Sequence, residues 1–143
     1  MDNTQPNAYG ATLLRLTLGG LFLAHAGLKY FVFTPGGTAQ FFESIGLPGL
    51  LAYAVLTAEV LGGIALILGV YTRLVALALV PILLGAIFSV HASAGFFFTN
   101  EKGGWEFPAF WAVALIVQAL IGDGAFALRP TKLAQNPSRL AAT

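Results

Sequence analysis

The sequence contains no cysteine among its 143 residues. This absence excludes disulfide bonds, thiolate metal ligands, iron–sulfur ligation and any thiol or persulfide relay by this chain itself. Charged residues are also scarce, at 9% of the chain, whereas roughly a quarter of the residues in a soluble domain are charged. So few charges cannot cover the surface of a soluble globule, and they are typical of a surface that faces lipid.

The chain also lacks a strong net charge and any recognisable cofactor motif. Its formal net charge is +1, which gives no support for nucleic-acid binding. No covalent haem motif or nucleotide-binding motif is present, so we predict no covalently bound cofactor. His25, His91 and Glu59 are residue types that bind zinc or iron. Three such side chains on three helices more often form a hydrogen-bonded network, and we predict no metal.

Apolar residues are what the sequence has in abundance. They make up 57% of the chain, and the mean hydropathy is +0.82. Four apolar runs lie between turn-forming residues, at about 11–33, 50–70, 74–91 and 107–123. The runs approach or exceed the length that crosses a hydrocarbon core of about 30 Å. We therefore predict a single all-α domain over residues 1–143, an integral membrane four-helix bundle.

The turns between the runs and the small residues within them add detail to this prediction. The semi-polar residues 38–47 lie between two breaker clusters and predict a short interfacial helix between the first two spans. Gly20 and Ala24, like Ala58 and Gly62, are spaced to let helices approach closely in lipid.

The distribution of basic residues predicts the orientation of the bundle. Four spans place both termini on the same side of the membrane. That side carries most of the basic residues, and the other carries Lys29 and Lys102; the first group is Arg15, Arg73, Arg129, Lys132 and Arg139. The positive-inside rule then places both termini in the cytoplasm.

Ionisable residues within the spans are the candidates for function, because a charge in the bilayer core is costly. At about 100° per residue, Arg15, His25 and Lys29 share one face of the first span. His25 and Glu59 lie at similar depths, and the long Lys29 side chain can reach Glu59. His91 ends the third span on the same side. We predict a polar, candidate catalytic site formed by His25, Lys29, Glu59 and His91.

Each of these residues also has a structural interpretation. Lys29 can extend to the interface, and His91 can be an ordinary interfacial residue. Glu59 is the hardest to dismiss, because a carboxylate in mid-span must be paired or protonated. At the opposite end of the bundle we predict a structural ion pair between Arg15 and Asp123. Trp105 and Trp111 are interpreted most simply as interfacial anchors.

A series of short motifs runs through most of the chain in a fixed order. They are Leu14-Arg15-Leu16 with Gly19, Gly27-Leu28-Lys29, Phe41-Phe42, Ile45-Gly46-Leu47-Pro48, Ala58-Glu59-Val60-Leu61-Gly62-Gly63, Leu68-Gly69-Val70-Tyr71-Thr72-Arg73 and Gly122-Asp123-Gly124-Ala125-Phe126-Ala127-Leu128. Over residues 12–128, this pattern resembles the DoxX family of small bacterial membrane proteins.

The resemblance implies a four-helix fold in a bacterial cytoplasmic (inner) membrane and an association with redox chemistry. One branch of the family is similar to a subunit of thiosulfate:quinone oxidoreductase, and another is associated with oxidative-stress and thiol handling. The resemblance places Arg15, Lys29, Glu59 and Asp123 at the family's polar positions. The absence of cysteine argues against direct sulfur-relay chemistry by this chain.

Three hypotheses for function remain open at this point. The first is a redox-associated subunit with a quinone site, where Phe22, Lys29, Tyr53 and Glu59 form the slot and Glu59 or His25 moves protons. The second is a non-enzymatic scaffold or partner subunit of a larger membrane complex. The third is a small transporter or lipid-handling protein. The expected partners are membrane lipid, other membrane or oxidoreductase subunits and, as a further option, a second copy of the chain.

Overall fold

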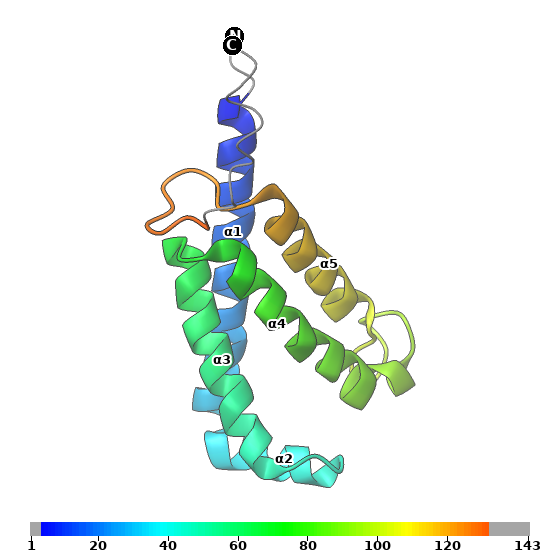
Figure 1. Ribbon diagram of the computed structural model, residues 1–143. Helices are drawn as coiled ribbons and strands as arrows, with labels where there is room; N and C mark the ends of the chain where they lie inside the picture. Colours follow the sequence, from blue (N-terminus) through cyan, green and yellow to red (C-terminus); the bar gives the residue numbers. More distant parts are fainter. Residues whose placement is uncertain (1–3, 132–143) are drawn as a thin grey trace, which may run out of the picture.

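The computed structural model describes residues 4–131, and every long element in this range is a helix (Figure 1). The helices are α1 (Thr4–Gly27), α2 (Pro35–Ser44), α3 (Gly49–Leu68), α4 (Thr72–Ala86) and α5 (Glu106–Ile121). Two π-helical turns, Leu28–Val32 and Ile87–His91, extend α1 and α4, and a 3₁₀ turn follows at Ala92–Ala94. Within this range the all-α prediction is confirmed.

Three helical stretches are long and apolar enough to cross a membrane. They are Pro6–Val32 with 27 residues, Gly49–Leu68 with 20 and Thr72–Ala94 with 23. The fourth predicted run forms α5, an apolar helix of 16 residues. At about 1.5 Å per residue, α5 is roughly 24 Å long, somewhat shorter than the hydrocarbon core.

The predicted interfacial segment between the first two runs is a helix, α2. It begins three residues earlier than the sequence suggested, because Thr34 caps it. The Thr34 hydroxyl accepts a hydrogen bond from the Gly37 backbone N–H at 3.1 Å, and Pro35 occupies the first turn. Both features are preferred at helix N-termini.

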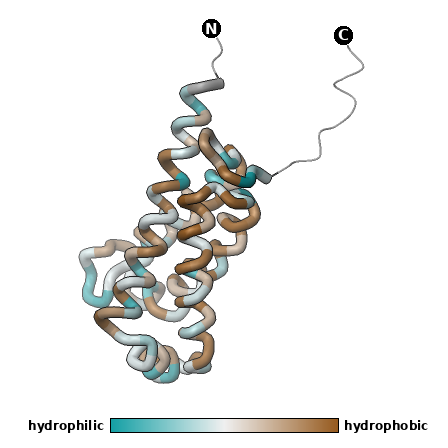
Figure 2. The backbone as a smooth tube through the Cα atoms, turned by 90° about the vertical axis from the view of Figure 1, so that its left-hand side faces the viewer, coloured by the Kyte–Doolittle hydropathy of each residue, from teal (hydrophilic) through white to brown (hydrophobic). Residues whose placement is uncertain are grey.

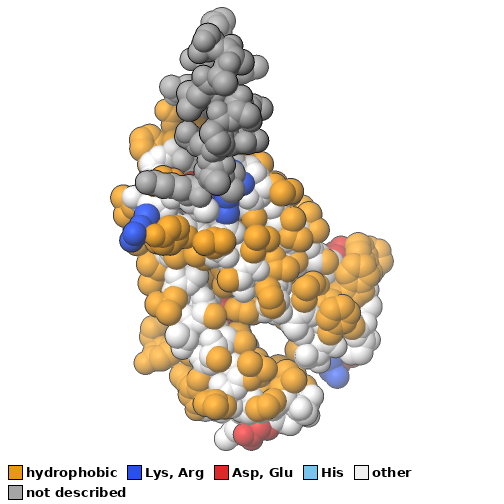
Figure 3. Space-filling view, viewed as in Figure 1, with side chains coloured by type: hydrophobic (Ala, Val, Ile, Leu, Met, Phe, Trp, Pro, Cys, Tyr) orange, Lys and Arg blue, Asp and Glu red, His pale blue; other side chains and the backbone are white. Residues whose placement is uncertain are grey.

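The helices form two antiparallel pairs, α1 with α3 and α4 with α5 (Figure 1). The pairs meet where α3 connects to α4 and where α5 finishes, beside the N-terminal half of α1, and we call this the terminal end (Figure 1). They diverge toward the opposite end, which carries α2 and the 95–105 loop and which we call the α2 end. Figure 3 shows an opening at the α2 end, between the lower parts of α3 and α4. The bundle is therefore tightly closed at one end and splayed at the other.

The interior is an apolar core to which α1, α3, α4 and α5 all contribute. Its largest members are Leu18, Phe22, Leu66, Leu79, Leu83, Trp111 and Leu115. Much of the remaining surface is also apolar, and the more hydrophilic residues gather in the turns and loops (Figure 2). An apolar core inside an apolar exterior is what a lipid environment requires.

The segment 122–131 closes the terminal end by backbone pairing. The Ala125 N–H donates to the Ala8 carbonyl of α1 at 3.2 Å, and the Leu128 N–H donates to the Leu68 carbonyl of α3 at 3.0 Å. Gly69 ends α3 in a left-handed conformation, with φ of 70°, which favours glycine at the residue after a helix. This segment thus ties α1 to the α3–α4 connection.

A close contact between helices joins Gly19 of α1 to Gly63 of α3. A Cβ atom at Gly19 would lie 2.7 Å from the Gly63 carbonyl oxygen, and a Cβ at Gly63 would lie 3.0 Å from the Gly19 oxygen. The adjacent Gly62 faces Leu79 of α4. Of the predicted small-residue positions, Gly62 lies in a close helix contact, whereas a Cβ atom at Gly20 would have no neighbour within 4 Å. The contact between Gly19 and Gly63 fixes α1 against α3.

We expect Gly19→Ala to lower the thermal stability of the detergent-purified protein. The new methyl group must push α1 away from α3, and such overpacking typically costs about 1–3 kcal/mol. Gly20→Ala is the matched control, because a Cβ atom at that position would have no neighbouring atom within 4 Å. Equal melting temperatures for the two variants would show that the Gly19–Gly63 contact does not limit packing.

Candidate functional site

An ion pair between Lys29 and Glu59 is the most prominent polar feature of the bundle interior. The Lys29 Nζ atom lies 2.6 Å from Glu59 Oε1 and 2.7 Å from Oε2, so one ammonium contacts both carboxylate oxygens. Glu59 is buried, with 4% of its surface exposed, whereas the Lys29 side chain is 21% exposed. The structure therefore joins these two residues across the α1–α3 interface.

Local structure explains why the two side chains meet. Side chains on a helix lean toward its N-terminus. Because α1 and α3 are antiparallel, Lys29 leans away from the α2 end and Glu59 leans toward it, so each side chain approaches the other. Lys29 also lies in the π-helical turn Leu28–Val32, where the Phe33 N–H donates to the Leu28 carbonyl at 3.1 Å. Such single π turns frequently occur at functional sites.

His25 lies one turn along α1 from Lys29, toward the middle of the helix. Its Nδ1 atom is 3.0 Å from the Leu21 carbonyl oxygen. Its ring stacks on Phe107 of α5, with centroids 6.4 Å apart, and is tilted against Trp111, with centroids 4.8 Å apart. His25 therefore connects the α1–α3 pair to α5 rather than bonding directly to Glu59.

Trp111 is a site residue that sequence reasoning missed. The interpretation as an interfacial anchor is wrong, because only 4% of Trp111 is exposed, and its ring packs against Phe22 with centroids 4.5 Å apart. A signal was present in the sequence: it belongs to a helical stripe at spacings of one, four, seven and eight residues, formed by Trp111, Ala112, Leu115, Gln118 and Ala119. All five are buried, as a core-facing stripe should be.

His91 lies at the α2 end but is turned toward the loop. Its Nδ1 atom is 2.8 Å from the Gly103 carbonyl oxygen. Among the described residues, no hydrogen bond, ion pair or ring contact links His91 to His25, Lys29 or Glu59. The four predicted residues therefore do not form one bonded cluster. Lys29 pairs with Glu59, His25 lies one turn away, and His91 is separate.

The predicted quinone slot is also only partly assembled. Phe22 is fully buried in the core, on the same helix as Lys29. Tyr53 is 45% exposed and lies about 120° around α3 from Glu59. Tyr53 therefore faces outward, away from the ion pair, while Phe22 packs beneath His25 against Trp111.

At the terminal end, Arg15 and Asp123 bind helix ends in place of the predicted ion pair. Arg15 is 1% exposed; its Nη1 donates to the Leu66 and Ile67 carbonyls at 3.2 and 3.0 Å, and its Nη2 donates to the Ala125 carbonyl at 3.1 Å. No Arg15–Asp123 salt bridge occurs among the described residues. The Leu66 and Ile67 carbonyls at the end of α3 lack the usual backbone donors four residues later and are partly negative, so they compete successfully for the guanidinium.

Asp123 is held at the start of α4. Its Oδ1 accepts from the Thr72 backbone N–H at 3.1 Å, and its Oδ2 accepts from the Thr131 N–H at 3.0 Å. Arg73, which was not among the predicted site residues, donates from Nη1 to the Ala119 and Leu120 carbonyls of α5 at 2.8 and 3.0 Å. These charges complement helix termini and are structural.

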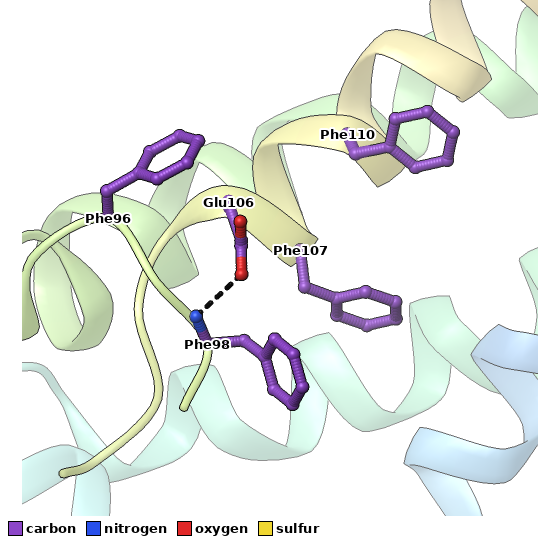
Figure 4. A pocket seen from close by; sticks show the side chains of 5 residues that line it. All are labelled: Phe96, Phe98, Glu106, Phe107 and Phe110. Atoms are coloured by element: carbon purple, nitrogen blue, oxygen red, sulfur yellow. Dashed lines mark hydrogen bonds between the residues drawn. The ribbon is translucent and has the colours of Figure 1, made fainter. Parts of the chain in front are cut away.

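An aromatic pocket of about 400 Å³ lies at the α2 end, beside the start of α5. Its lining residues are Phe96, Phe98, Glu106, Phe107 and Phe110 (Figure 4). The Glu106 Oε1 atom accepts from the Phe98 backbone N–H at 2.8 Å, and the rings of Phe98 and Phe107 point to the same side. Phe107 also stacks on His25, so one aromatic ring separates the pocket from His25, which does not itself line the pocket. In residues 4–131, no group of three or more histidine or acidic side chains is arranged to hold a metal ion.

Comparison with known proteins finds a family and a named relative. The sequence profile of the DoxX family matches residues 10–92. A protein of Bacillus subtilis strain 168 named "Putative oxidoreductase CatD" is 38% identical over 121 residues, which cover 85% of each chain. No solved structure gives a significant match.

We expect either single substitution, Lys29→Met or Glu59→Gln, to destabilise the protein more than the combination of both. Breaking a buried pair leaves one charge uncompensated, at a cost of roughly 3 kcal/mol, whereas removing both charges avoids that cost. A double-mutant cycle of thermal unfolding in detergent measures this coupling. Additive effects of the two substitutions would mean that the pair contributes nothing to stability.

Proposed function

Because the chain belongs to the DoxX family, we propose that it is a redox-associated multi-pass membrane protein with a quinone-type site. The observation that carries the proposal is the Lys29–Glu59 pair, buried between long apolar helices with His25 one turn away. Ionisable groups are rare at such positions and generally mark pathways for protons, ions or substrates. The relative named as an oxidoreductase favours redox chemistry among these options.

The residues match the chemical requirements of a quinone. Reduction to a quinol takes up two electrons and two protons. In this proposal a partner oxidoreductase subunit supplies the two electrons, and the two protons come from the aqueous phase, with His25 or Glu59 relaying them to the quinone oxygens. The Lys29 ammonium favours the negative charge that develops on a quinone oxygen as electrons arrive. The apolar surroundings strengthen these electrostatic effects, because the effective dielectric constant is low.

The size and the apolar lining of the aromatic pocket also support the proposal. Small-molecule sites are typically concave, apolar and about 300–1,000 Å³ in volume, with a few polar groups that orient the ligand. The pocket of about 400 Å³ falls in this range. Phe107 lines the pocket and stacks on His25, so only this ring separates an aromatic headgroup in the pocket from a group that exchanges protons.

A second candidate function is that of a partner subunit without a ligand of its own. The two-oxygen contact between Lys29 and Glu59 favours this role, since a charge pair satisfied internally is a good interhelical clamp. Under this alternative, the polar residues hold α1 and α3 together while a larger membrane complex performs the chemistry. A measurement of quinone binding distinguishes the two functions, because only the first requires it.

We also propose that α5 is a fourth span, with both termini in the cytoplasm of a bacterial inner membrane. The described ends of the chain lie at the same end of the bundle, as an even number of crossings requires (Figure 1). Figure 3 shows blue basic side chains at this end. Arg73 binds the last carbonyls of α5 and Arg129 pairs with Gly69 and Tyr71, whereas Lys102 lies in the loop at the α2 end. The positive-inside rule then orients the terminal end toward the cytoplasm. Splaying of the helix pairs and local thinning of the bilayer accommodate a helix as short as α5.

Quinone titration of the purified protein tests the proposed site. We expect ubiquinone and menaquinone analogues to quench tryptophan fluorescence saturably. Glu59→Gln should weaken binding about tenfold or more, because it removes the charge that positions Lys29. Glu101→Gln is the control, since Glu101 is exposed in the loop and should leave affinity unchanged.

Two results would contradict the quinone site. The first is the absence of saturable binding to the folded wild-type protein. The second is equal affinity of wild type and a correctly folded Glu59→Gln variant. Either result, together with lower stability of Glu59→Gln, favours the partner-subunit role.

The topology is testable by labelling single cysteines, since the natural chain has none. We expect Thr99→Cys, in the 95–105 loop between α4 and α5, to react with a membrane-impermeant maleimide in intact cells. Leu128→Cys, after α5, should react only once the membrane is permeabilised. Both positions are exposed in the structure, so access reports the side of the membrane. Labelling of both from the same side would show that α5 does not cross.

A further inference from the structure

The indole N–H of Trp111 is a buried donor that lacks an acceptor. Among the described residues, Trp111 Nε1 has no hydrogen-bond partner, although the residue is almost completely buried. Buried tryptophan N–H groups usually find a partner, and in lipid no bulk water is present to supply one. This donor lies inside the bundle, on the helix face that contacts His25 and Phe22.

The neighbouring His25 ring presents an acceptor. Its Nδ1 atom contacts the Leu21 carbonyl oxygen at 3.0 Å. A carbonyl oxygen only accepts, so Nδ1 carries the proton, and Nε2 of the neutral ring carries a lone pair. Within the described residues, Nε2 makes no hydrogen bond and is not bonded to Trp111 Nε1. A fixed donor and a fixed acceptor therefore lie on two rings whose centroids are 4.8 Å apart.

The Phe107 ring separates the aromatic pocket from this donor–acceptor pair. Phe107 lines the pocket, stacks on His25 and contacts the Trp111 ring with centroids 5.8 Å apart. Phe107 is itself partly exposed. A planar aromatic ligand that displaces the exposed Phe107 ring from its contacts with His25 and Trp111 would turn its polar edge toward both of them.

We infer that Trp111 and His25 together bind a phenolic hydroxyl group, and that the site prefers a reduced quinol to the oxidised quinone. The hydroxyl oxygen accepts from Trp111 Nε1–H, and the hydroxyl hydrogen is donated to His25 Nε2. One hydroxyl oxygen, with an angle of about 110° between its donor and its acceptor, bridges two nitrogens roughly 4.7 Å apart. A quinone carbonyl accepts from Trp111 but has no hydrogen for His25, which leaves that lone pair unsatisfied. This inference rests on the proposed function and specifies which redox form the site retains.

Three ligands of nearly the same shape isolate the hydroxyl group: menadiol, menadione and menadiol dimethyl ether. Their binding to the full-length protein in nanodiscs, under anaerobic conditions, is measured by calorimetry. We expect wild type to bind menadiol about tenfold more tightly than the other two, the effect of one well-made hydrogen bond. The ether keeps the oxygen atoms but has no hydrogen to donate.

Two variants test the residues separately while keeping aromatic packing. Trp111→Phe removes the donor and His25→Phe removes the acceptor, and each should bring the menadiol-to-ether affinity ratio close to one. Trp105→Phe is the control, because Trp105 contacts Phe96 in the loop rather than His25, and it should preserve the ratio. Circular dichroism and melting temperature verify the fold of each variant.

The outcomes separate this inference from the quinone site itself. Equal affinities of wild type for the three ligands, or an unchanged ratio in both folded variants, overturn the hydroxyl assignment. If Glu59→Gln still weakens quinone binding in that case, the quinone site stands without it. Absence of binding by all three ligands overturns both proposals.

Discussion

The contact between Gly19 and Gly63 sets the register on which the polar site depends. From this contact, Lys29 lies about 15 Å along α1 and Glu59 about 6 Å along α3, both toward the α2 end. Side chains that lean toward their own N-termini close most of that difference, because the helices are antiparallel. A wider helix separation would leave a buried carboxylate without its ammonium, which lipid penalises strongly. Because Gly19 and Gly63 have no side chains, the two helices come close enough for Lys29 to contact Glu59.

At the terminal end, charged side chains form hydrogen bonds with backbone groups at the helix ends. Arg15 binds carbonyls at the end of α3, Arg73 binds carbonyls at the end of α5, and Asp123 accepts from the start of α4. Each charge opposes the partial charge of the helix terminus that it contacts. The segment 122–131 adds backbone pairing to the same region. With this end closed, the helix pairs diverge only toward the α2 end, where the pocket and the polar residues lie.

Features that follow from helical periodicity and from depth in the membrane could be predicted from the sequence. Contacts for which several partners compete could not. The all-α class follows from the apolar runs, and the approach of Lys29 to Glu59 follows from their depths in antiparallel helices. Depth also suggested the Arg15–Asp123 pair, but it takes no account of the carbonyls at the end of α3 that bind Arg15 instead. Trp111 was misplaced because a tryptophan near a span boundary resembles an anchor, although its helical stripe indicated the core. The separation of His91 depends on the path of the 95–105 loop, which periodicity does not report.

The polar residues divide into groups that are satisfied and groups that are not, and this division indicates where a ligand binds. Lys29 and Glu59 saturate each other through both carboxylate oxygens, so a ligand that displaced either would leave a charge unpaired. Trp111 Nε1 and His25 Nε2 have no such partners in the described chain, so a ligand gains both bonds without breaking any. The ion pair is therefore better suited to providing an electrostatic field than a contact surface. On this argument, the ligand exchanges at the two rings, and the ion pair one turn away stabilises the charge that develops there.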